Sequence, residues 1–471
     1  MHNVDIDLVD MAMDVMKFAI QRITDADPVL GFPKKEAELK ALVGETVTPK
    51  GIGGEKAFQL FRDVLLKSSI SIDHRRHLAF VPASPTRSAV MFDLVTSASS
   101  IHGAFWLEGA GGIFAENQAM QWLVDLTGMP SGSFGVFTSG GTEANLSALV
   151  TAREHWRSLD LTRVNKRGLI ITSDGAHSSI RSMAKVIDAD IMAIPTEDRF
   201  EAAHLREAID NLTAEDRQRL FAVIAAGGTT NAGIVDDLAG LAVIAEKEGL
   251  WFHVDAAYGG GALAAPSVRH LFEGIERADS VTIDPHKWLF STYDCGAVIY
   301  RRPELARTAH AQEGSYLDAF HEQEYLGFNP SDYQIQLTRR LRGLPFWFSL
   351  AMHGTDRYTV AIERGLELAQ IAAKQIDALP FVELVREPSL SCVLFRRIGW
   401  TPKDYFDWTF RNHKSGFALV TPTKSRKADG GKETVARFCF INPDTTEEDI
   451  ADILATMADT AAQLDSVAAV S

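Results

Sequence analysis

The middle of the chain alternates short runs of apolar residues with longer stretches of helical periodicity. Most of the apolar runs are continuous rather than alternating, as expected for strands that are buried on both faces. This order predicts an α/β fold in which helices cover both faces of a mainly parallel sheet. The expected strands are residues 135–138, 169–172, 191–194, 221–225, 251–255, 280–283 and 296–300.

Further patterns predict structure in the parts of the chain before and after these strands. Residues 4–23 place apolar side chains at helical spacing, which predicts an amphipathic helix that needs a partner surface. After a basic and then aromatic stretch at 339–352, a long helix at about 356–379 reads as a connector. The remainder predicts strands near 392–396 and 437–441, a loop at 425–432 and a final helix from Thr446. We therefore expect an N-terminal helical segment (1–86), a large α/β domain (87–345) and a small α+β C-terminal domain (346–471).

The composition excludes several classes of protein. With 46% hydrophobic and 23% charged residues, the chain is globular and can bury a large core. A formal charge of −15 and the lack of a Lys/Arg run give no positive field for a phosphate backbone, so no nucleic-acid partner is expected. No stretch approaches the roughly 18 apolar residues of a spanning helix, and the N-terminus is acidic where a signal peptide is basic. We expect no membrane segment.

The cysteines and histidines do not suggest a metal site or a disulfide framework. Cys295, Cys392 and Cys439 are far apart in the sequence, and each lies in or beside an apolar stretch. His74 and His77 lack further ligands for zinc, so their segment is interpreted as a loop. The sequence thus predicts no metal and a reducing, cytoplasmic location.

Two neighbouring strands end in residues that carry chemistry. In doubly wound sheets, ligands bind beyond the carboxyl ends of the strands. Asp255 ends one strand, and a carboxylate there can bind the protonated ring nitrogen of pyridoxal phosphate (PLP). The next strand leads into Asp284-Pro-His286-Lys287-Trp288, a segment too apolar for an ordinary surface lysine. Such desolvation disfavours the ammonium and would supply a free amine for imine formation.

Each of these residues also has an ordinary structural interpretation. An Asp at a strand end is more often a helix cap or a turn residue. A lysine after a strand is solvated in most proteins. The pair of Asp255 and Lys287 on neighbouring strand ends is much more specific than either residue alone.

Three loops complete the pattern. Gly141 and Thr142 follow a strand and precede a helix at 143–156, where backbone N–H groups and the helix dipole could hold a phosphate. Thr142 could instead be only an N-cap, and the lack of a following Lys disfavours a nucleoside-triphosphate loop. His177 could stack on a cofactor ring, and Thr230 could bond the phenolic oxygen of the ring. A capped helix and a tight turn are the structural alternatives for these two loops.

In this order, the motifs resemble those of the group II PLP-dependent amino acid decarboxylases, the family of the aromatic-L-amino-acid, histidine, glutamate and cysteine sulfinate decarboxylases. The most specific motif is residues 284–288, supported by residues 138–145, 176–179, 228–230 and 253–257. The resemblance covers nearly the whole chain. It implies the PLP-dependent fold type I of aspartate aminotransferase. It also implies a homodimer with active sites between subunits and interlocking N-terminal helices.

The resemblance implies three catalytic residues. Lys287 forms the imine with PLP, and His177 stacks on the ring and assists proton transfer. Tyr316 matches the tyrosine of a mobile loop that closes over the partner subunit's site and protonates the α-carbon. Relatives that make aldehydes by oxidative deamination tend to have Phe there, so Tyr316 favours simple decarboxylation. An ordinary half-buried loop tyrosine is the alternative.

The remaining cofactor contacts follow from the same resemblance. Asp255 pairs with the ring nitrogen. The other expected contacts are Gly141, Thr142 and His286 at the phosphate, Ala257 beneath the ring and Thr230 at the phenolic oxygen. Asp284 is also expected near the phosphate, but it departs from the family, because aromatic decarboxylases usually carry Asn there. A second anion beside the phosphate would repel it unless the carboxylate is protonated or turned away.

The substrate is less sharply defined. By resemblance, the pocket draws on residues 77–83 and, from the other subunit, on residues 101–106. Phe80 and its apolar neighbours suit an aromatic side chain, whereas His102 or Arg437 could bind an acidic or polar group.

Three functions therefore remain. The first is α-decarboxylation of an aromatic L-amino acid to the amine and CO2. The second is decarboxylation of an acidic or diamino acid, such as glutamate, aspartate, cysteine sulfinate or 2,4-diaminobutyrate. The third is a PLP-dependent aldehyde synthase or a relative that does not decarboxylate.

Overall fold

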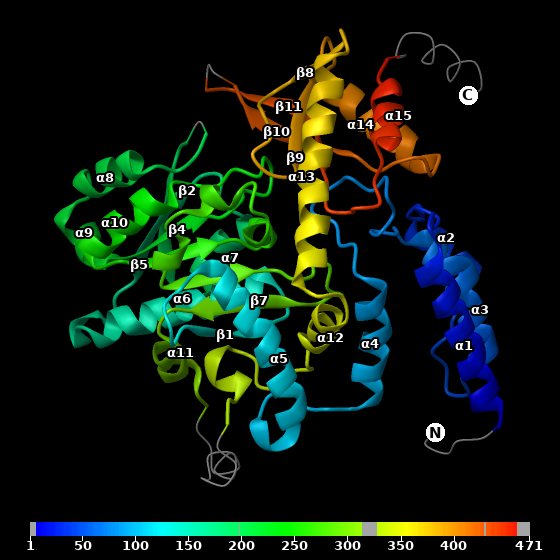
Figure 1. The fold of residues 1–471 in the computed structure, drawn as a ribbon, viewed down its shortest axis with the longest axis horizontal. Helices are drawn as coiled ribbons and strands as arrows, with labels where there is room; N and C mark the ends of the chain where they lie inside the picture. The colour runs from blue at the N-terminus through cyan, green and yellow to red at the C-terminus, as the bar shows by residue number, and fades with distance from the viewer. Residues whose placement is uncertain (1–5, 197, 313–326, 428–429, 459–471) are drawn as a thin grey trace.

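A seven-stranded sheet forms the centre of the computed structural model, which describes residues 6–196, 198–312, 327–427 and 430–458 (Figure 1). The strand order is β1-β7-β6-β5-β4-β2-β3. β7 is antiparallel to both of its neighbours, and all other pairs are parallel. The strands are β1 (Phe134–Thr138), β2 (Gly168–Ser173), β3 (Ala189–Ile194), β4 (Leu220–Ala226), β5 (Trp251–Asp255), β6 (Ser280–Ile283) and β7 (Gly296–Tyr300). The predicted mainly parallel sheet is confirmed.

Helices cover both faces of this sheet because alternate residues of each strand point to opposite faces. One face carries α5 (Trp106–Thr127), α8 (Ala202–Asp210), α10 (Leu238–Glu248) and α12 (Leu344–His353). The other carries α6 (Gly141–Ser158), α7 (Ser178–Val186) and α11 (Pro303–His310). Along β2, Ile171 packs into the first core and Ile170 into the second. The connections contain α9 (Ala214–Arg219) and the short helices η3 (Leu161–Arg163), η4 (Gly259–Ala264), η5 (Arg269–Phe272), η6 (Ile275–Arg277) and η9 (Pro330–Tyr333).

The N-terminal segment is helical. Its helices are α1 (Ile6–Thr24), α2 (Glu36–Val43) and α3 (Gly54–Leu60) with its continuations η1 (Phe61–Leu65) and η2 (Leu66–Ser68). The next helix, α4 (Arg87–Ala98), begins the predicted large domain. Helices α1 to α3 stand beside the α/β body, whereas α4 packs against α12 (Figure 1). Phe18 contacts Phe58 with ring centroids 5.6 Å apart. The predicted amphipathic helix is thus present as α1. Among the described residues, no helix is both long and apolar enough to cross a membrane.

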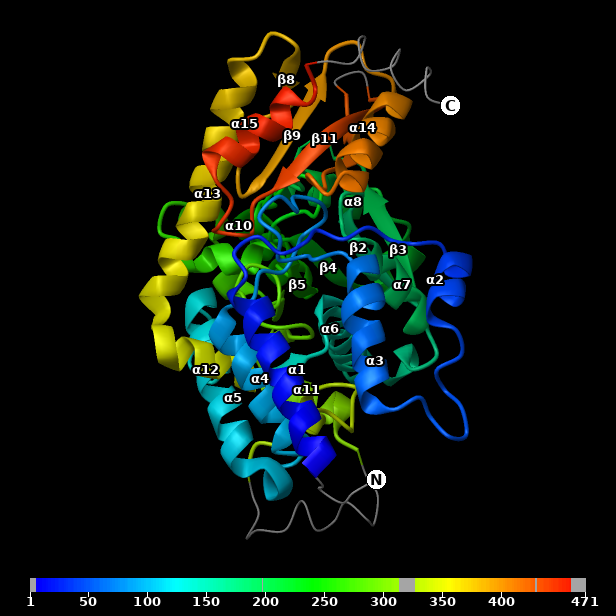
Figure 2. The same cartoon turned by 90° about the vertical axis from the view of Figure 1, so that its right-hand side faces the viewer.

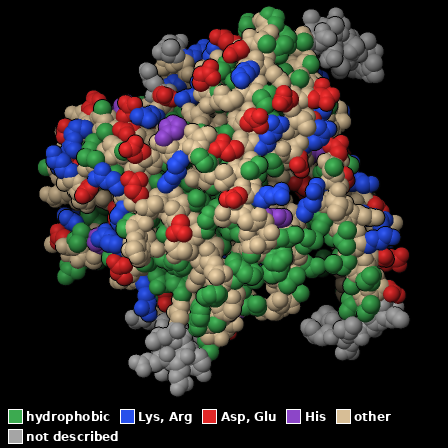
Figure 3. All heavy atoms as spheres, in the orientation of Figure 1, with side chains coloured by type: hydrophobic (Ala, Val, Ile, Leu, Met, Phe, Trp, Pro, Cys, Tyr) green, Lys and Arg blue, Asp and Glu red, His purple; other side chains and the backbone are tan. Residues whose placement is uncertain are grey.

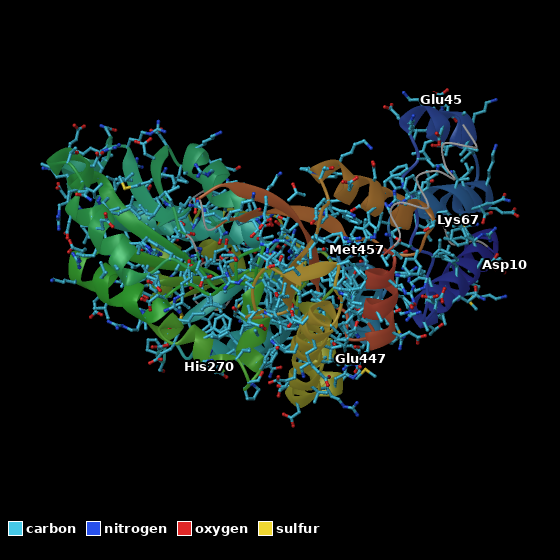
Figure 4. All side chains as sticks on the ribbon, turned by 90° about the horizontal axis from the view of Figure 1, so that it is seen from above. Asp10, Glu45, Lys67, His270, Glu447 and Met457 are labelled. Carbon is cyan, nitrogen blue, oxygen red and sulfur yellow. The ribbon has the colours of Figure 1, made fainter. Side chains whose placement is uncertain are left out.

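A smaller antiparallel sheet forms the C-terminal part, in the order β10-β11-β9-β8. Its strands are β8 (Val382–Leu384), β9 (Cys392–Arg397), β10 (Thr421–Arg426) and β11 (Lys432–Cys439). It is covered by α13 (Thr355–Asp377), α14 (Pro402–Lys414) and α15 (Glu447–Ala455). Figure 2 shows α13 running from the α/β body to this sheet. In Figure 4, α15 lies between the body and the N-terminal helices, which carry the labelled Asp10 and Lys67.

Four details differ from the expectation. The short edge strand β8 (Val382–Leu384) was not predicted. Residues 421–426 form an edge strand that the sequence did not predict, because they contain few apolar residues and a proline, which edge strands tolerate. Strand β11 ends at Cys439 rather than at 441, and its pairing with β10 places Ser425, Arg426 and Lys432 of the predicted loop in strands. The boundary predicted between 345 and 346 falls inside α12. The division into three domains stays a prediction.

Two of the three cysteines become neighbours in this sheet. Cys392 and Cys439, 47 residues apart, are paired across β9 and β11 with 3.8 Å between their sulfur atoms. Both are buried free thiols, as is Cys295. Strand register creates this contact, and the spacing of the cysteines in the sequence does not reveal it.

Candidate active site

A cavity of about 280 Å³ lies beyond the carboxyl ends of β4, β5 and β6. This is the edge at which parallel sheets of this kind bind ligands. All nine residues expected to contact the cofactor line the cavity: Gly141, Thr142, His177, Thr230, Asp255, Ala257, Asp284, His286 and Lys287. The fold therefore brings together five segments that are widely separated in the sequence.

Lys287 is an ion-paired ammonium in this structure. Its Nζ lies 3.0 Å from Asp284 Oδ2. Burial by itself would lower the pKa of Lys287, but the negative charges of Asp284 and Asp255 outweigh burial and raise the pKa above its ordinary value. The prediction that desolvation makes this amine neutral is therefore wrong here, because the carboxylate three residues earlier compensates for the lost water.

Asp284 is the second charged group at the floor of the cavity. Its residue is 3% exposed. Its Oδ2 faces Lys287 and lies 3.8 Å from His286 Nε2, while its Oδ1 is buried without a hydrogen-bond partner among the described residues. Burial lowers the pKa of His286, and this effect is larger than the opposite effect of the nearby Asp284. The floor therefore holds one ammonium and one carboxylate beside an imidazole that favours its neutral form.

The loop between β1 and α6 forms a cradle. Gly140 has φ 151°, a value that residues with a Cβ rarely adopt. A Cβ on Gly141 would lie 2.9 Å from Asp284 Oδ2 and 3.1 Å from the Cβ of Ala257, so no side chain fits between the helix end and the cavity floor. The helix begins at Gly141 with Gly140 as its N-cap, so the interpretation of Thr142 as an N-cap is wrong. The first N–H groups of α6 have no partner within the helix, and its positive end suits a phosphate.

Glu143 holds this cradle closed. Its Oε2 accepts hydrogen bonds from the backbone N–H of Ser139 at 2.7 Å and from the Ser139 hydroxyl at 2.6 Å. Neither residue was among the predicted contacts, although both lie within the motif at 138–145. The cradle and the lysine together fit a phosphate-bearing aldehyde such as PLP.

Asp255 is held at the end of β5 by two donors. Its Oδ2 accepts from Asn145 Nδ2 at 2.9 Å and its Oδ1 from the backbone N–H of Ala257 at 3.2 Å. Each carboxylate oxygen has a further lone pair, so the group can still accept a bond from a protonated ring nitrogen. Asn145, 110 residues from Asp255 in the chain, is a site residue that sequence reasoning did not single out.

His177 serves as a cap and lines the cavity. It is the N-cap of α7, where its Nδ1 accepts from the backbone N–H of Ser179 at 3.2 Å and lies 2.9 Å from the Ser179 hydroxyl. The structural alternative considered for this residue is therefore present, and it does not exclude a contact with the cofactor ring.

Arg437 lies behind the cavity rather than in its lining. The residue is 4% exposed. Its guanidinium donates to the backbone oxygens of Asn231 at 2.9 Å, of Thr230 at 2.6 Å and of Phe80, and to the Cys392 sulfur at 3.1 Å. Arg437 therefore joins the loop of Phe80 to the loop of Thr230.

The other expected substrate and loop residues do not meet in this cavity. Phe80 is 63% exposed and has φ 56°, in the left-handed region. His102 Nδ1 is hydrogen-bonded to Glu108 and does not line the cavity. Tyr316 lies outside the described residues. A single chain thus brings together the expected cofactor contacts but not the expected substrate contacts.

Comparisons with known proteins agree with this geometry. The pyridoxal-dependent decarboxylase conserved domain matches residues 50–398. The aromatic-L-amino-acid decarboxylase of Bacillus atrophaeus is 30% identical over 435 residues, 88% of this chain and 87% of that protein. The L-2,4-diaminobutyrate decarboxylase of Acinetobacter baumannii is 27% identical over 446 residues, 89% of this chain and 86% of that protein. The crystal structure of Oryza sativa TDC with PLP and tryptamine has a TM-score of 0.88 at 24% identity and covers 97% of this chain and 99% of that one.

The fold, the cavity and the matched domain together define a PLP enzyme of fold type I. The match over most of the chain settles its family. The chain belongs to the pyridoxal-dependent decarboxylases and is a PLP-dependent amino acid decarboxylase. The predicted family and cofactor are thereby confirmed.

Proposed function

We propose that the protein removes the α-carboxylate of an aromatic L-amino acid and releases the amine and CO2. The observation that supports this substrate class best is the environment of Arg437. Its guanidinium makes four hydrogen bonds within the protein, and a substrate carboxylate would have to break them. The exposed ring of Phe80, whose carbonyl Arg437 holds, offers an apolar contact instead.

The residues of the cavity have separate tasks in this proposal. PLP, when bound, supplies the electron sink that lets the α-carboxylate leave. Lys287 holds the cofactor covalently, the first turn of α6 and His286 bind its phosphate, and Ala257 packs against its ring. Asp255 keeps a proton on the ring nitrogen, and Thr230 bonds the phenolic oxygen. His177 covers the ring.

One proton movement follows from the described positions, and a second rests on the family resemblance. The Lys287 ammonium must lose a proton before Nζ can bond to carbon. Asp284 Oδ2, 3.0 Å away, is placed to accept that proton. Tyr316 then delivers a proton to the substrate α-carbon, with His177 assisting. A protonated Asp284 would also relieve the repulsion between its carboxylate and the phosphate.

A second copy of the chain completes the site in this proposal. Hydrophobic side chains gather over α5, α4 and α1 in Figure 3. Met13, Ile20, Met91, Leu94 and Phe114 are among the exposed ones. We propose that these helices form a homodimer interface that brings residues 101–106 and the loop of Tyr316 to the partner's cavity. Sedimentation of the purified protein tests this, and a monomer at micromolar concentration would contradict it.

A diamino acid is the second candidate substrate. The similarity to the L-2,4-diaminobutyrate decarboxylase covers 89% of this chain, nearly the same share as the similarity to the aromatic decarboxylase. The carboxylate of Glu108, bonded to His102, is a group that could bind a second ammonium. An acidic amino acid has less support because both expected cations, Arg437 and His102, already have partners.

One assay separates the candidates. CO2 and amine are measured for a panel of aromatic, acidic and diamino acids, in air and under nitrogen, with PLP-saturated protein. Activity on aromatic substrates that does not depend on oxygen supports the proposal. Preference for 2,4-diaminobutyrate would select the second candidate. Aldehyde formation together with oxygen consumption would select an aldehyde synthase.

The three buried free thiols fit a reducing location, and we propose the cytoplasm.

A further inference from the structure

A chain of four hydrogen bonds leads from the interior of the sheet to Asp255. The Trp251 indole N–H donates to the Ser280 oxygen at 2.8 Å. Ser280 Oγ lies 2.8 Å from His253 Nδ1, and His253 Nε2 lies 2.9 Å from Asn145 Oδ1. Asn145 Nδ2 donates to Asp255 Oδ2 at 2.9 Å. Asn145, His253 and Ser280 are buried.

The direction of every bond in this chain is fixed. An ionised carboxylate only accepts, so the NH2 of Asn145 faces Asp255 and its oxygen faces His253. His253 Nε2 must then carry a hydrogen. Burial lowers the pKa of His253 to about 4, so the ring is neutral and Nδ1 accepts from the Ser280 hydroxyl. All donors therefore point toward the cavity.

Asn145 has a second contact, which leads to His177 in the lining of the cavity. Its Nδ2 lies 3.5 Å from the hydroxyl of Ser179, which in turn lies 2.9 Å from His177 Nδ1. The Asn145 amide thus contacts Asp255, which is expected at the ring nitrogen, and Ser179, the hydrogen-bond partner of His177, which is expected over the ring plane.

We propose that Asn145 is a positioning residue for the cofactor, which orients Asp255 directly and His177 through Ser179. The inference rests on the proposed role of Asp255 at the ring nitrogen. The physical reason for an amide at this position is that it carries no charge. A lysine or arginine at this position would neutralise Asp255, whereas a neutral amide fixes the carboxylate and leaves its negative charge available for a cationic ring. The neutral His253 behind Asn145 likewise adds no competing cation.

The test measures PLP affinity and the geometry of bound PLP. Asn145→Ala removes both contacts, and Asn145→Asp keeps the shape but replaces the donor with a second carboxylate. Asn442→Ala is the matched control, because Asn442 is also buried and makes two hydrogen bonds of 2.9 Å, to Asp73 and Asp444. PLP dissociation constants come from fluorescence titration. The circular dichroism of the cofactor band reports how rigidly the ring is held.

We expect Asn145→Ala to weaken PLP binding about tenfold, or about 1.4 kcal/mol, and to reduce the dichroic band. Asn145→Asp should weaken it further, and Asn442→Ala should stay within about threefold of the wild type. Wild-type PLP binding with affinity and dichroism unchanged in both Asn145 variants would overturn this inference alone. Failure of the wild type to bind PLP would overturn the proposed function as well.

A second variant covers the case in which the Asn145 variants do not fold. Ser280→Ala removes one hydroxyl that is three hydrogen bonds from Asp255. We expect it to weaken PLP binding about threefold and to reduce the dichroic band. An unchanged affinity and dichroic band would contradict the inference.

Discussion

The cofactor cavity and the substrate wall of this protein are built in different ways. The cavity lies at the ends of paired strands, and its side chains are held by bonds such as those of Asp255 to Asn145 and Ala257. The expected substrate residues Phe80 and His102 lie on loops, and Phe80 is largely exposed. A sheet edge fixes positions within one chain, whereas the substrate wall depends on loops and, in our proposal, on a second subunit.

Arg339 is an anchor common to both regions, and its loss should have the largest effect. Its buried guanidinium bonds to Glu116 at 2.9 Å, to the Gly103 carbonyl in the substrate segment and to the Phe137 carbonyl in β1. Arg339→Met leaves the buried Glu116 carboxylate without its ion-pair partner, so we expect the free energy of unfolding in urea to fall by about 3–5 kcal/mol. Arg340→Met, which removes a part-exposed pair with Asp93, should cost under about 1 kcal/mol. Equal losses of unfolding free energy in the two variants would contradict this role of Arg339.

Asp255 tests the cavity alone. Asp255→Asn removes the negative charge at the ring nitrogen, and we expect kcat to fall by about 10²- to 10³-fold. Asp279→Asn is the control, because Asp279 lies at the opposite edge of the same strands, where it accepts from the backbone N–H of Phe252. Steady-state CO2 release measures both variants. A loss under about threefold in Asp255→Asn would remove the proposed role of this carboxylate.

Low pH should lower the stability of the folded protein through one buried histidine in each region. Burial lowers the pKa values of His253, behind the cavity, and of His77, the first residue of the expected substrate segment 77–83, to about 4. Between pH 4 and the ordinary pKa of about 6.5, the unfolded chain binds more protons than the folded chain does. The contribution of each histidine to stability is therefore fully present above this pH window and is lost as the pH falls through it. Each histidine contributes up to about 3 kcal/mol. Urea unfolding at pH 7 and 5 should show a smaller loss in His77→Gln than in the wild type, and equal losses would contradict the assignment.

Phe80 tests the substrate wall alone. Phe80→Ala should lower kcat/KM for aromatic substrates about tenfold through lost apolar contact, with PLP affinity unchanged. Phe406→Ala, which removes an exposed ring on α14, is the matched control. An equal effect on all substrates would indicate that Phe80 does not contact the substrate side chain.

The smallest effect is expected at His102. Because His102 already has a hydrogen-bond partner in Glu108, His102→Gln should change kcat/KM for aromatic substrates by less than about threefold. A loss above tenfold would assign His102 to the substrate and favour the second candidate class.

The sequence predicted the sheet and the meeting of Asp255 with the segment of Lys287 because both follow from local rules. Apolar runs define strands buried on both faces, and parallel strands bring their carboxyl ends to one edge, where Asp255 and the segment of Lys287 meet. The family resemblance added the roles of the surrounding loops. Strand β10 escaped prediction because an edge strand needs little apolar character.

Other features depend on contacts that only the folded chain creates. The pKa of Lys287 is set by a competition between burial and Asp284, and no residue pattern gives its sign. Asn145 meets Asp255 across 110 residues, and Arg437 meets the carbonyls of Phe80 and Thr230 through the packing of β11. Tyr316, the expected proton donor, lies outside the described residues and stays a prediction.

The covalent attachment of PLP to Lys287 is the central claim, and one measurement tests it directly. The purified protein is incubated with PLP, reduced with borohydride to trap the lysine-bound cofactor, digested and sequenced by mass spectrometry. Our account predicts a single modified peptide with the phosphopyridoxyl group on Lys287, and no modified peptide in Lys287→Ala. Modification of another lysine, or of none in protein that retains its fold, would contradict it.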